Sequence, residues 1–150
     1  RVFTGDRSGD WLFAAMHRAG LANQAESTSR DDGLELSDAW VTAAVRCAPP
    51  DNKPSIEERD ECAPFLAEEL ALLKRCQVVV CLGAFGFQAA CRHFDVRPRP
   101  RFGHGAECVV DGGPTLICSF HPSQQNTFTG RLTEEMLDHV FARARELTIE

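Results

Sequence analysis

The run Val78–Leu82 constrains the fold more than any other part of this chain. All of its residues are apolar, which is typical of a strand buried on both faces of a sheet. Gly83 follows directly, and a short helical pattern through Cys91 begins after it. A second apolar strand is predicted at Thr115–Phe120. The turn Asp111–Gly113 before it indicates an antiparallel pairing with a strand near residues 107–110.

Amphipathic helical patterns lie between and around these strands. Residues 8–19 carry an apolar stripe at helical spacing, and Ser55 and Glu58 have the spacing of a capping box that opens a helix reaching Leu73. Thr133 is placed to cap a last helix, and a further strand is predicted at Trp40–Val45. The alternation of strands and helices predicts an α/β fold with a mostly parallel sheet, helices on both of its sides and a single domain spanning residues 1–150.

Composition narrows the class of protein. The chain has 150 residues, of which 43% are hydrophobic, so it can bury a core, and no apolar run approaches the ~18 residues of a membrane span. The net charge of −6 argues against a protein that coats nucleic acid by charge alone, although it leaves room for a local basic face. The seven cysteines do not have the regular spacing of a disulfide framework, and no secretory leader is visible. Both features predict a reducing, cytoplasmic compartment.

His121 is the sharpest candidate for chemistry. It directly follows an apolar strand and precedes Pro122, and ligands of open α/β sheets bind beyond the carboxyl ends of the strands. A neutral imidazole there can donate a hydrogen bond to a developing oxyanion. The alternative is a histidine satisfied by nearby backbone. The polar run 123–126 favours function, because such groups are costly to hold without a partner.

Several other residues are candidates for function, and for some of them the sequence leaves a structural and a functional interpretation open. Asp6 lies in a Gly-Asp-Arg-Ser-Gly turn and can be a helix cap or a functional carboxylate. Cys47 and Cys62 do not have zinc-finger spacing, and the remaining cysteines fall on apolar faces. His104, between two glycines, is typical of a flexible loop. A cluster of arginines is either a phosphate-binding loop or a solvated one: Arg92, Arg97, Arg99 and Arg101.

Four segments together resemble a known family. The run 121–126, His-Pro-Ser-Gln-Gln-Asn, followed by Thr-Phe-Thr-Gly-Arg-Leu-Thr, resembles the C-terminal motif of uracil-DNA glycosylases. The run 45–54, followed by Cys62, resembles the iron–sulfur branch of that superfamily. Residues 3–9 and 101–105 are similar to the family 5 type of bacteria and archaea. The match runs through nearly the whole chain, with the motifs in the family's order.

This resemblance implies a three-layer α/β/α sandwich that flips uracil out of DNA and hydrolyses its N-glycosidic bond. Other deaminated bases such as hypoxanthine are expected substrates, in single- or double-stranded DNA of the nucleoid, and the protein is expected to act as a monomer. By the same resemblance, His121 donates to uracil O2, Phe3 stacks on the flipped base, and Asp6 orients or activates water. We therefore expect Phe3 and His121 to share a cavity that accepts a nucleobase.

The resemblance also assigns binding residues. Expected substrate contacts are Gly5, Ala43, Ser123 and Asn126; expected DNA contacts are Gln124, Gln125 and Arg131. Further basic residues of the expected DNA-binding face are Arg7, Lys53, Arg99 and Arg101. Cys47 and Cys62 match two of the four thiolates that a [4Fe–4S] cluster requires.

Two departures from the family pattern have consequences. The family's first strand, its first motif and a Cys-x-x-Cys pair with the other two cluster ligands are expected upstream of Arg1. Ala43-Ala44 stands where many relatives have an asparagine that reads the uracil edge, so looser base selection is expected.

Two other hypotheses remain. The first is a catalytically impaired DNA-binding relative or fragment of the same fold, which the retention of Asp6 and His121 disfavours. The second is an unrelated α/β redox protein that uses its thiols. The chain has no Gly-x-Gly-x-x-Gly fingerprint after a strand and no Cys-x-x-Cys pair, and both absences disfavour this second hypothesis.

Overall fold

The computed structural model describes residues 3, 5–42, 64 and 66–148. Its sheet has the strand order β1 (Val78–Leu82), β3 (Thr115–Ser119), β2 (Glu107–Val109). β1 and β3 run parallel, with Val80 opposite Ile117. β2 pairs with β3 in the antiparallel sense, as the turn between them predicts. The described sheet is thus mixed, with one parallel and one antiparallel pair.

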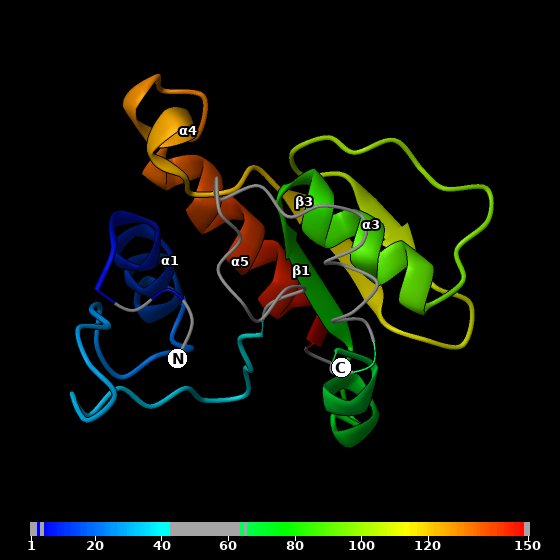
Figure 1. The fold of residues 1–150 in the computed structure, drawn as a ribbon, viewed down its shortest axis with the longest axis horizontal. Coiled ribbons are helices and arrows are strands. Elements are labelled where there is room, and N and C mark those ends of the chain that lie inside the picture. The colour runs from blue at the N-terminus through cyan, green and yellow to red at the C-terminus, as the bar shows by residue number, and fades with distance from the viewer. Residues whose placement is uncertain (1–2, 4, 43–63, 65, 149–150) are drawn as a thin grey trace.

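Helices cover both faces of this sheet (Figure 1). On one face α3 (Gly83–His93) contributes Phe87 and Cys91 to a buried cluster with Leu116 and Cys118 of β3. On the other face α5 (Glu134–Thr148) packs against Ile117. Successive β3 residues therefore point to opposite faces, as the pleat of a strand requires. The predicted α/β fold with helices on both sides of the sheet is confirmed.

The N-terminal helix α1 (Arg7–Arg18) packs against α5 rather than against a strand. Its apolar stripe of Leu12, Phe13 and Met16 meets Leu137 and Phe141 in one buried cluster. The helix is predicted from the sequence by the helical spacing of Trp11, Leu12, Ala15, Met16 and Ala19, and Phe13 adds to its buried face. α1 begins after Asp6, and Phe3, which precedes this start, contacts His121 beyond the end of β3.

The segment around Trp40 differs from its prediction. The described part of the strand expected at 40–45, residues 40–42, forms no strand. Trp40 is 64% exposed, and its indole N–H donates to Glu69 Oε2 over 3.1 Å. Its ring therefore lies on the surface, whereas its neighbours Ala39 and Val41 pack against the core without forming a strand. Residues 66–72 are helical, in agreement with the helix predicted to reach Leu73.

The C-terminal part holds one helix that the sequence did not predict, α4 (Gln124–Phe128). The last helix is α5, and the amide of Met136 donates to the hydroxyl of Thr133 over 3.2 Å, which confirms the predicted cap. None of the helices in the described ranges has the length and apolar character needed to cross a bilayer.

Candidate functional site

His121 lies just beyond the carboxyl end of β3, beside the end of β1. The two strands are parallel and end together at Leu82 and Ser119. Gly83, the first residue after β1, has φ +87°, and a Cβ built on it would lie 3.3 Å from the Cβ of His121. A glycine at this position therefore leaves room for the His121 side chain. The carboxyl edge of the sheet is where α/β folds place ligands.

Phe3 and His121 are brought together from opposite ends of the chain. Their ring centroids are 5.7 Å apart and the ring planes are tilted by 41°, a separation typical of contacting aromatic rings. Phe3 is held in place by α1, because a Cβ on Gly9 would come within 1.9 Å of the Phe3 carbonyl oxygen. The backbone amide of Gly5 donates to Ser27 O over 2.7 Å, which fixes the same loop from its other side.

Asp6 lies close enough to His121 to act on its charge. One carboxylate oxygen, Oδ1, accepts a hydrogen bond from the Gly9 amide over 2.7 Å and so caps α1. Burial lowers the pKa of His121 below its ordinary value of 6.5, and the negative charge of Asp6 opposes part of that shift. The imidazole is therefore neutral at pH 7 and can donate one N–H. The capping interpretation of Asp6 agrees with this geometry.

The loop after His121 is fastened by its own polar groups. The His121 carbonyl accepts hydrogen bonds from Asn126 Nδ2 over 2.9 Å and from the Ser123 amide over 2.8 Å. Ser123 Oγ accepts from the Asn126 amide and caps α4. Asn126 Nδ2 thus holds the loop. Gln124 and Gln125 are exposed.

Two arginines pack on aromatic rings beside this loop. Arg7 Nε donates to Thr127 Oγ1 over 3.1 Å, and its guanidinium carbon lies 4.2 Å from the ring centroid of Phe128. The guanidinium of Arg131 lies over the ring of Phe120, with its carbon 4.7 Å from the ring centroid. Both guanidiniums therefore lie next to the loop that carries His121, which gives this edge of the molecule local positive charge.

Comparison with known proteins shows which family this chain belongs to. The family model for the uracil DNA glycosylase superfamily matches residues 1–145. The chain belongs to this superfamily. It is 49% identical over 150 residues to the Type-5 uracil-DNA glycosylase of Mycobacterium tuberculosis, covering 98% of this chain and 56% of that protein. The Type-5 enzymes of Thermus thermophilus (47% over 148 residues, 98% of this chain, 67% of that protein) and Pyrobaculum aerophilum (43% over 144 residues, 96% and 62%) are also similar.

The chain spans little more than half the length of the mycobacterial Type-5 relative. Four residues with predicted roles lie outside the described residues: Ala43, Cys47, Lys53 and Cys62. Their predicted roles in base contact, in DNA contact and in cluster binding stay predictions. The predicted site residues that the structure does describe at the carboxyl edge of the sheet are Phe3, Gly5, Asp6 and the loop 121–126.

The described cysteines do not fit a metal cluster. Cys76, Cys81, Cys91, Cys108 and Cys118 are free thiols, and the last four belong to or pack against the apolar cluster under α3. Burial, and then the neighbouring thiols, raise the pKa of Cys81 to about 12, so it stays protonated. Among the described residues no group of three or more His, Cys, Asp or Glu side chains is placed to hold a metal.

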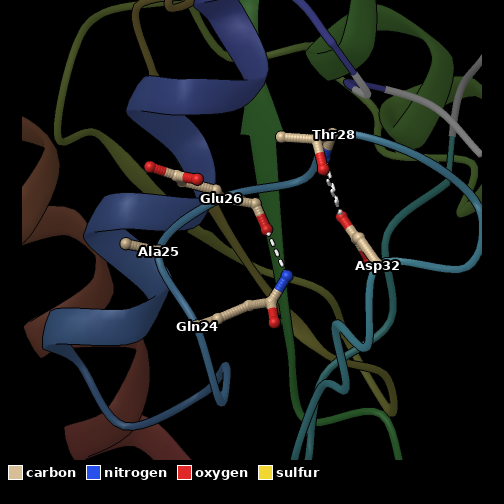
Figure 2. Close-up of a pocket in the computed structure, with 5 residues that line it drawn as sticks. All are labelled: Gln24, Ala25, Glu26, Thr28 and Asp32. Atoms are coloured by element: carbon tan, nitrogen blue, oxygen red, sulfur yellow. Dashed lines mark hydrogen bonds between the residues drawn. The ribbon is translucent and has the colours of Figure 1, made fainter.

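The predicted cavity between Phe3 and His121 stays a prediction, because the described residues show only that the two ring centroids lie 5.7 Å apart. A hollow of about 370 Å³ lies elsewhere, lined by Gln24, Ala25, Glu26, Thr28 and Asp32 (Figure 2). Polar groups of that loop bond to one another: Gln24 Nε2 donates to Glu26 O, and the Thr28 hydroxyl donates to Asp32 Oδ2 (Figure 2). The Thr28 amide donates to the same oxygen. The two predicted site rings contact each other at the carboxyl edge of the sheet, away from this hollow.

Sequence reasoning missed one residue of this site. His104 was expected in a flexible loop, but its Nδ1 accepts a hydrogen bond from the Phe120 amide over 3.0 Å. Phe120 directly precedes His121. A histidine flanked by glycines gives no local signal of such a bond, because its partner lies 16 residues away.

Proposed function

We propose that this protein removes uracil, and other deaminated bases such as hypoxanthine, from DNA by hydrolysing the N-glycosidic bond. The contact between the rings of Phe3 and His121 at the carboxyl edge of the sheet carries this proposal. The Phe3 ring offers a face for stacking on a flipped base, and the His121 ring offers an N–H group that can donate a hydrogen bond to it. The names of the Type-5 relatives point to uracil in DNA.

His121 would stabilise the leaving base. As the glycosidic bond breaks, the sugar gains oxocarbenium character and the electron pair moves onto uracil, where O2 becomes an oxyanion. A neutral imidazole donates to that oxygen without first losing a proton. One such donor typically contributes 10²–10³ in rate, about 2.7–4 kcal/mol. The hydrogen bonds that fix the His121 carbonyl support the preorganisation this requires.

Phe3 would stack on the extruded base. Flipping costs a few kcal/mol, and less at a damaged or mismatched pair. Stacking on one aromatic side chain is worth about 1–3 kcal/mol per base, so Phe3 can offset much of that cost. The backbone of Gly5 and the residues Ser123 and Asn126 would surround the base, and Asp6, beside His121, would orient the attacking water.

DNA would be held by the exposed loop that follows His121. Gln124, Gln125 and Arg131 are exposed there, and Arg7 is half-buried against Phe128. Guanidinium groups stacked on aromatic rings keep outward N–H groups for phosphate oxygens. The negative total charge does not oppose this role, because Arg7 and Arg131 supply local positive charge at the edge where DNA would bind.

The proposed cofactor is a [4Fe–4S] cluster, with Cys47 and Cys62 as two of its four thiolate ligands. When bound, it would supply local structure and charge, and the proposed chemistry at His121 does not pass through it. Iron and acid-labile sulfide should be found in the full-length gene product purified without oxygen. Loss of iron in Cys47→Ala, but not in the core variant Cys108→Ala, would support the ligand assignment, and no iron in the wild type would contradict it.

Base release tests the enzymatic proposal directly. The full-length gene product is incubated in excess with oligonucleotides that contain uracil or hypoxanthine, and abasic sites are counted after alkali. We expect release by the wild type, a loss of about 10² or more in His121→Ala, and little change in His93→Ala. His93 is an exposed residue at the far end of α3.

A non-catalytic relative is the alternative. It would bind lesion-containing DNA in a salt-dependent way and release no base. Binding without product from all deaminated substrates would favour that alternative. Release that is unaffected by His121→Ala would contradict the role proposed for the imidazole.

A further inference from the structure

His104 bonds to the strand that carries His121 at the point where backbone pairing ends. The backbone of residues 105–106 continues the pairing beside β3: Gly105 N donates to Cys118 O, and Cys118 N donates to Ala106 O. At the next outward position the ring of His104 takes over, and its Nδ1 accepts from the Phe120 amide over 3.0 Å. A side chain therefore fills the place of a strand carbonyl.

This hydrogen bond fixes the tautomer of His104. An amide N–H can only donate, so Nδ1 must carry the lone pair and the ring proton must sit on Nε2. Burial lowers the pKa of His104 below its ordinary value, and the Met136 carbonyl opposes part of that shift. The ring is therefore neutral at pH 7, and Nδ1 is available as an acceptor.

Phe120 is held from two further directions. The rings of His104 and Phe120 lie 4.9 Å apart with their planes tilted by 36°. The guanidinium of Arg131 lies over the ring of Phe120, its carbon 4.7 Å from the ring centroid. Beyond Phe120 the His121 carbonyl is fixed by Asn126. The backbone is thus restrained on both sides of the His121 Cα.

We propose that His104 is a positioning residue, whose Nδ1 acceptor fixes the Phe120 amide and so aims the His121 imidazole at the base. This inference rests on the proposed function of His121. His104 needs no contact with substrate, and its effect passes through the backbone of one residue. A misplacement of about 1 Å at a catalytic group can cost about 10²-fold in rate, so we expect a partial displacement to cost about 10-fold.

Two variants separate the acceptor from the ring. His104→Phe keeps a flat ring against Phe120 but has no acceptor, and His104→Asn places an amide oxygen near the position of Nδ1. In single-turnover uracil release by the full-length gene product, we expect His104→Phe to lower the maximal rate about 10-fold with little change in half-saturating concentration. His104→Asn should recover most of that loss. Urea unfolding of both variants shows whether stability follows the same order.

The hydrogen bond can also be read without activity. With ¹⁵N labelling, the wild type should show a through-hydrogen-bond coupling between the Phe120 amide nitrogen and His104 Nδ1. Absence of this coupling overturns the inference, even if His104→Phe does not fold. The inference is also overturned if a folded His104→Phe releases uracil at the wild-type rate, or if His104→Asn is as slow as His104→Phe. Unimpaired release by His121→Ala overturns the role proposed for the imidazole, on which this inference rests, whereas no release by the wild type overturns the proposed function.

Discussion

Replacing Gly83 by alanine places a methyl group against the candidate catalytic histidine. The new Cβ would lie 3.3 Å from the Cβ of His121, whereas carbon atoms pack best at about 3.5–4.0 Å. Relieving the contact requires a shift of roughly 0.4 Å if the optimum is taken near 3.7 Å. If the logarithm of the rate falls in proportion to displacement, and 1 Å costs about 10²-fold, this shift costs about sixfold.

The same substitution has a backbone cost that must be separated from the contact. Gly83 has φ +87°, and the left-handed conformation costs an alanine about 1–2 kcal/mol. Gly112 is a matched control, because its φ is +71° and a Cβ there would meet nothing within 4 Å. Gly83→Ala and Gly112→Ala should therefore lose similar free energy of unfolding, about 1–2 kcal/mol, in urea titrations.

Their activities should differ. In single-turnover uracil release under conditions where both variants are folded, Gly112→Ala should match the wild type and Gly83→Ala should be about sixfold slower. Equal rates in the two variants would refute the reasoning that the space beside Gly83 sets the position of His121. A loss in both variants that follows their stability would refute it as well.

Three further predictions concern stability. Gly9→Ala should destabilise the protein by at least about 2 kcal/mol, because the new Cβ would meet the Phe3 carbonyl oxygen at 1.9 Å. This loss would occur although alanine normally favours a helix interior over glycine by about 1 kcal/mol. Chemical denaturation measures the change, and a gain in stability would contradict the geometry. Leu137→Ala, at a fully buried position, should cost about 2–5 kcal/mol in the same assay, and a cost near zero would contradict its place in the core. Stability should fall as the pH drops below about 6.5, because the pKa values of His104 and His121 are lowered in the folded protein and the unfolded chain therefore binds protons first. In thermal melts, the double variant His104→Asn, His121→Asn should lose melting temperature less steeply with falling pH than the wild type. An unchanged pH dependence would refute this.

Much of the fold could be predicted because its signals are local. The apolar run Val78–Leu82 and the stripe of Leu12, Ala15 and Met16 each specify one element, and the turn before β3 specifies an antiparallel pair. Trp40 shows the limit of such patterns. Its neighbours are apolar enough for a strand, but the exposed indole bonds to Glu69, and no local pattern reveals that partner.

The candidate site depends on contacts between distant parts of the chain. His121 could be singled out because it follows a core strand, but its contact with Phe3 could be expected only through the family resemblance. The hydrogen bond between His104 and the Phe120 amide depends on the register between residues 104–106 and β3, which the local sequence does not reveal. α4 was also missed: Ser123 is a good cap, but the Asn, Thr and Phe that follow are weak helix formers.

The most direct test of the central claim is to see one base touch both rings. The full-length gene product is bound to DNA that carries an uncleavable 2′-fluoroarabino analogue of deoxyuridine, and nuclear Overhauser effects are recorded from the uracil H5 and H6 protons. We predict contacts from this one base to the ring protons of both Phe3 and His121. Contacts to neither ring, or a base found instead in the hollow beside Gln24 and Asp32, would contradict the account.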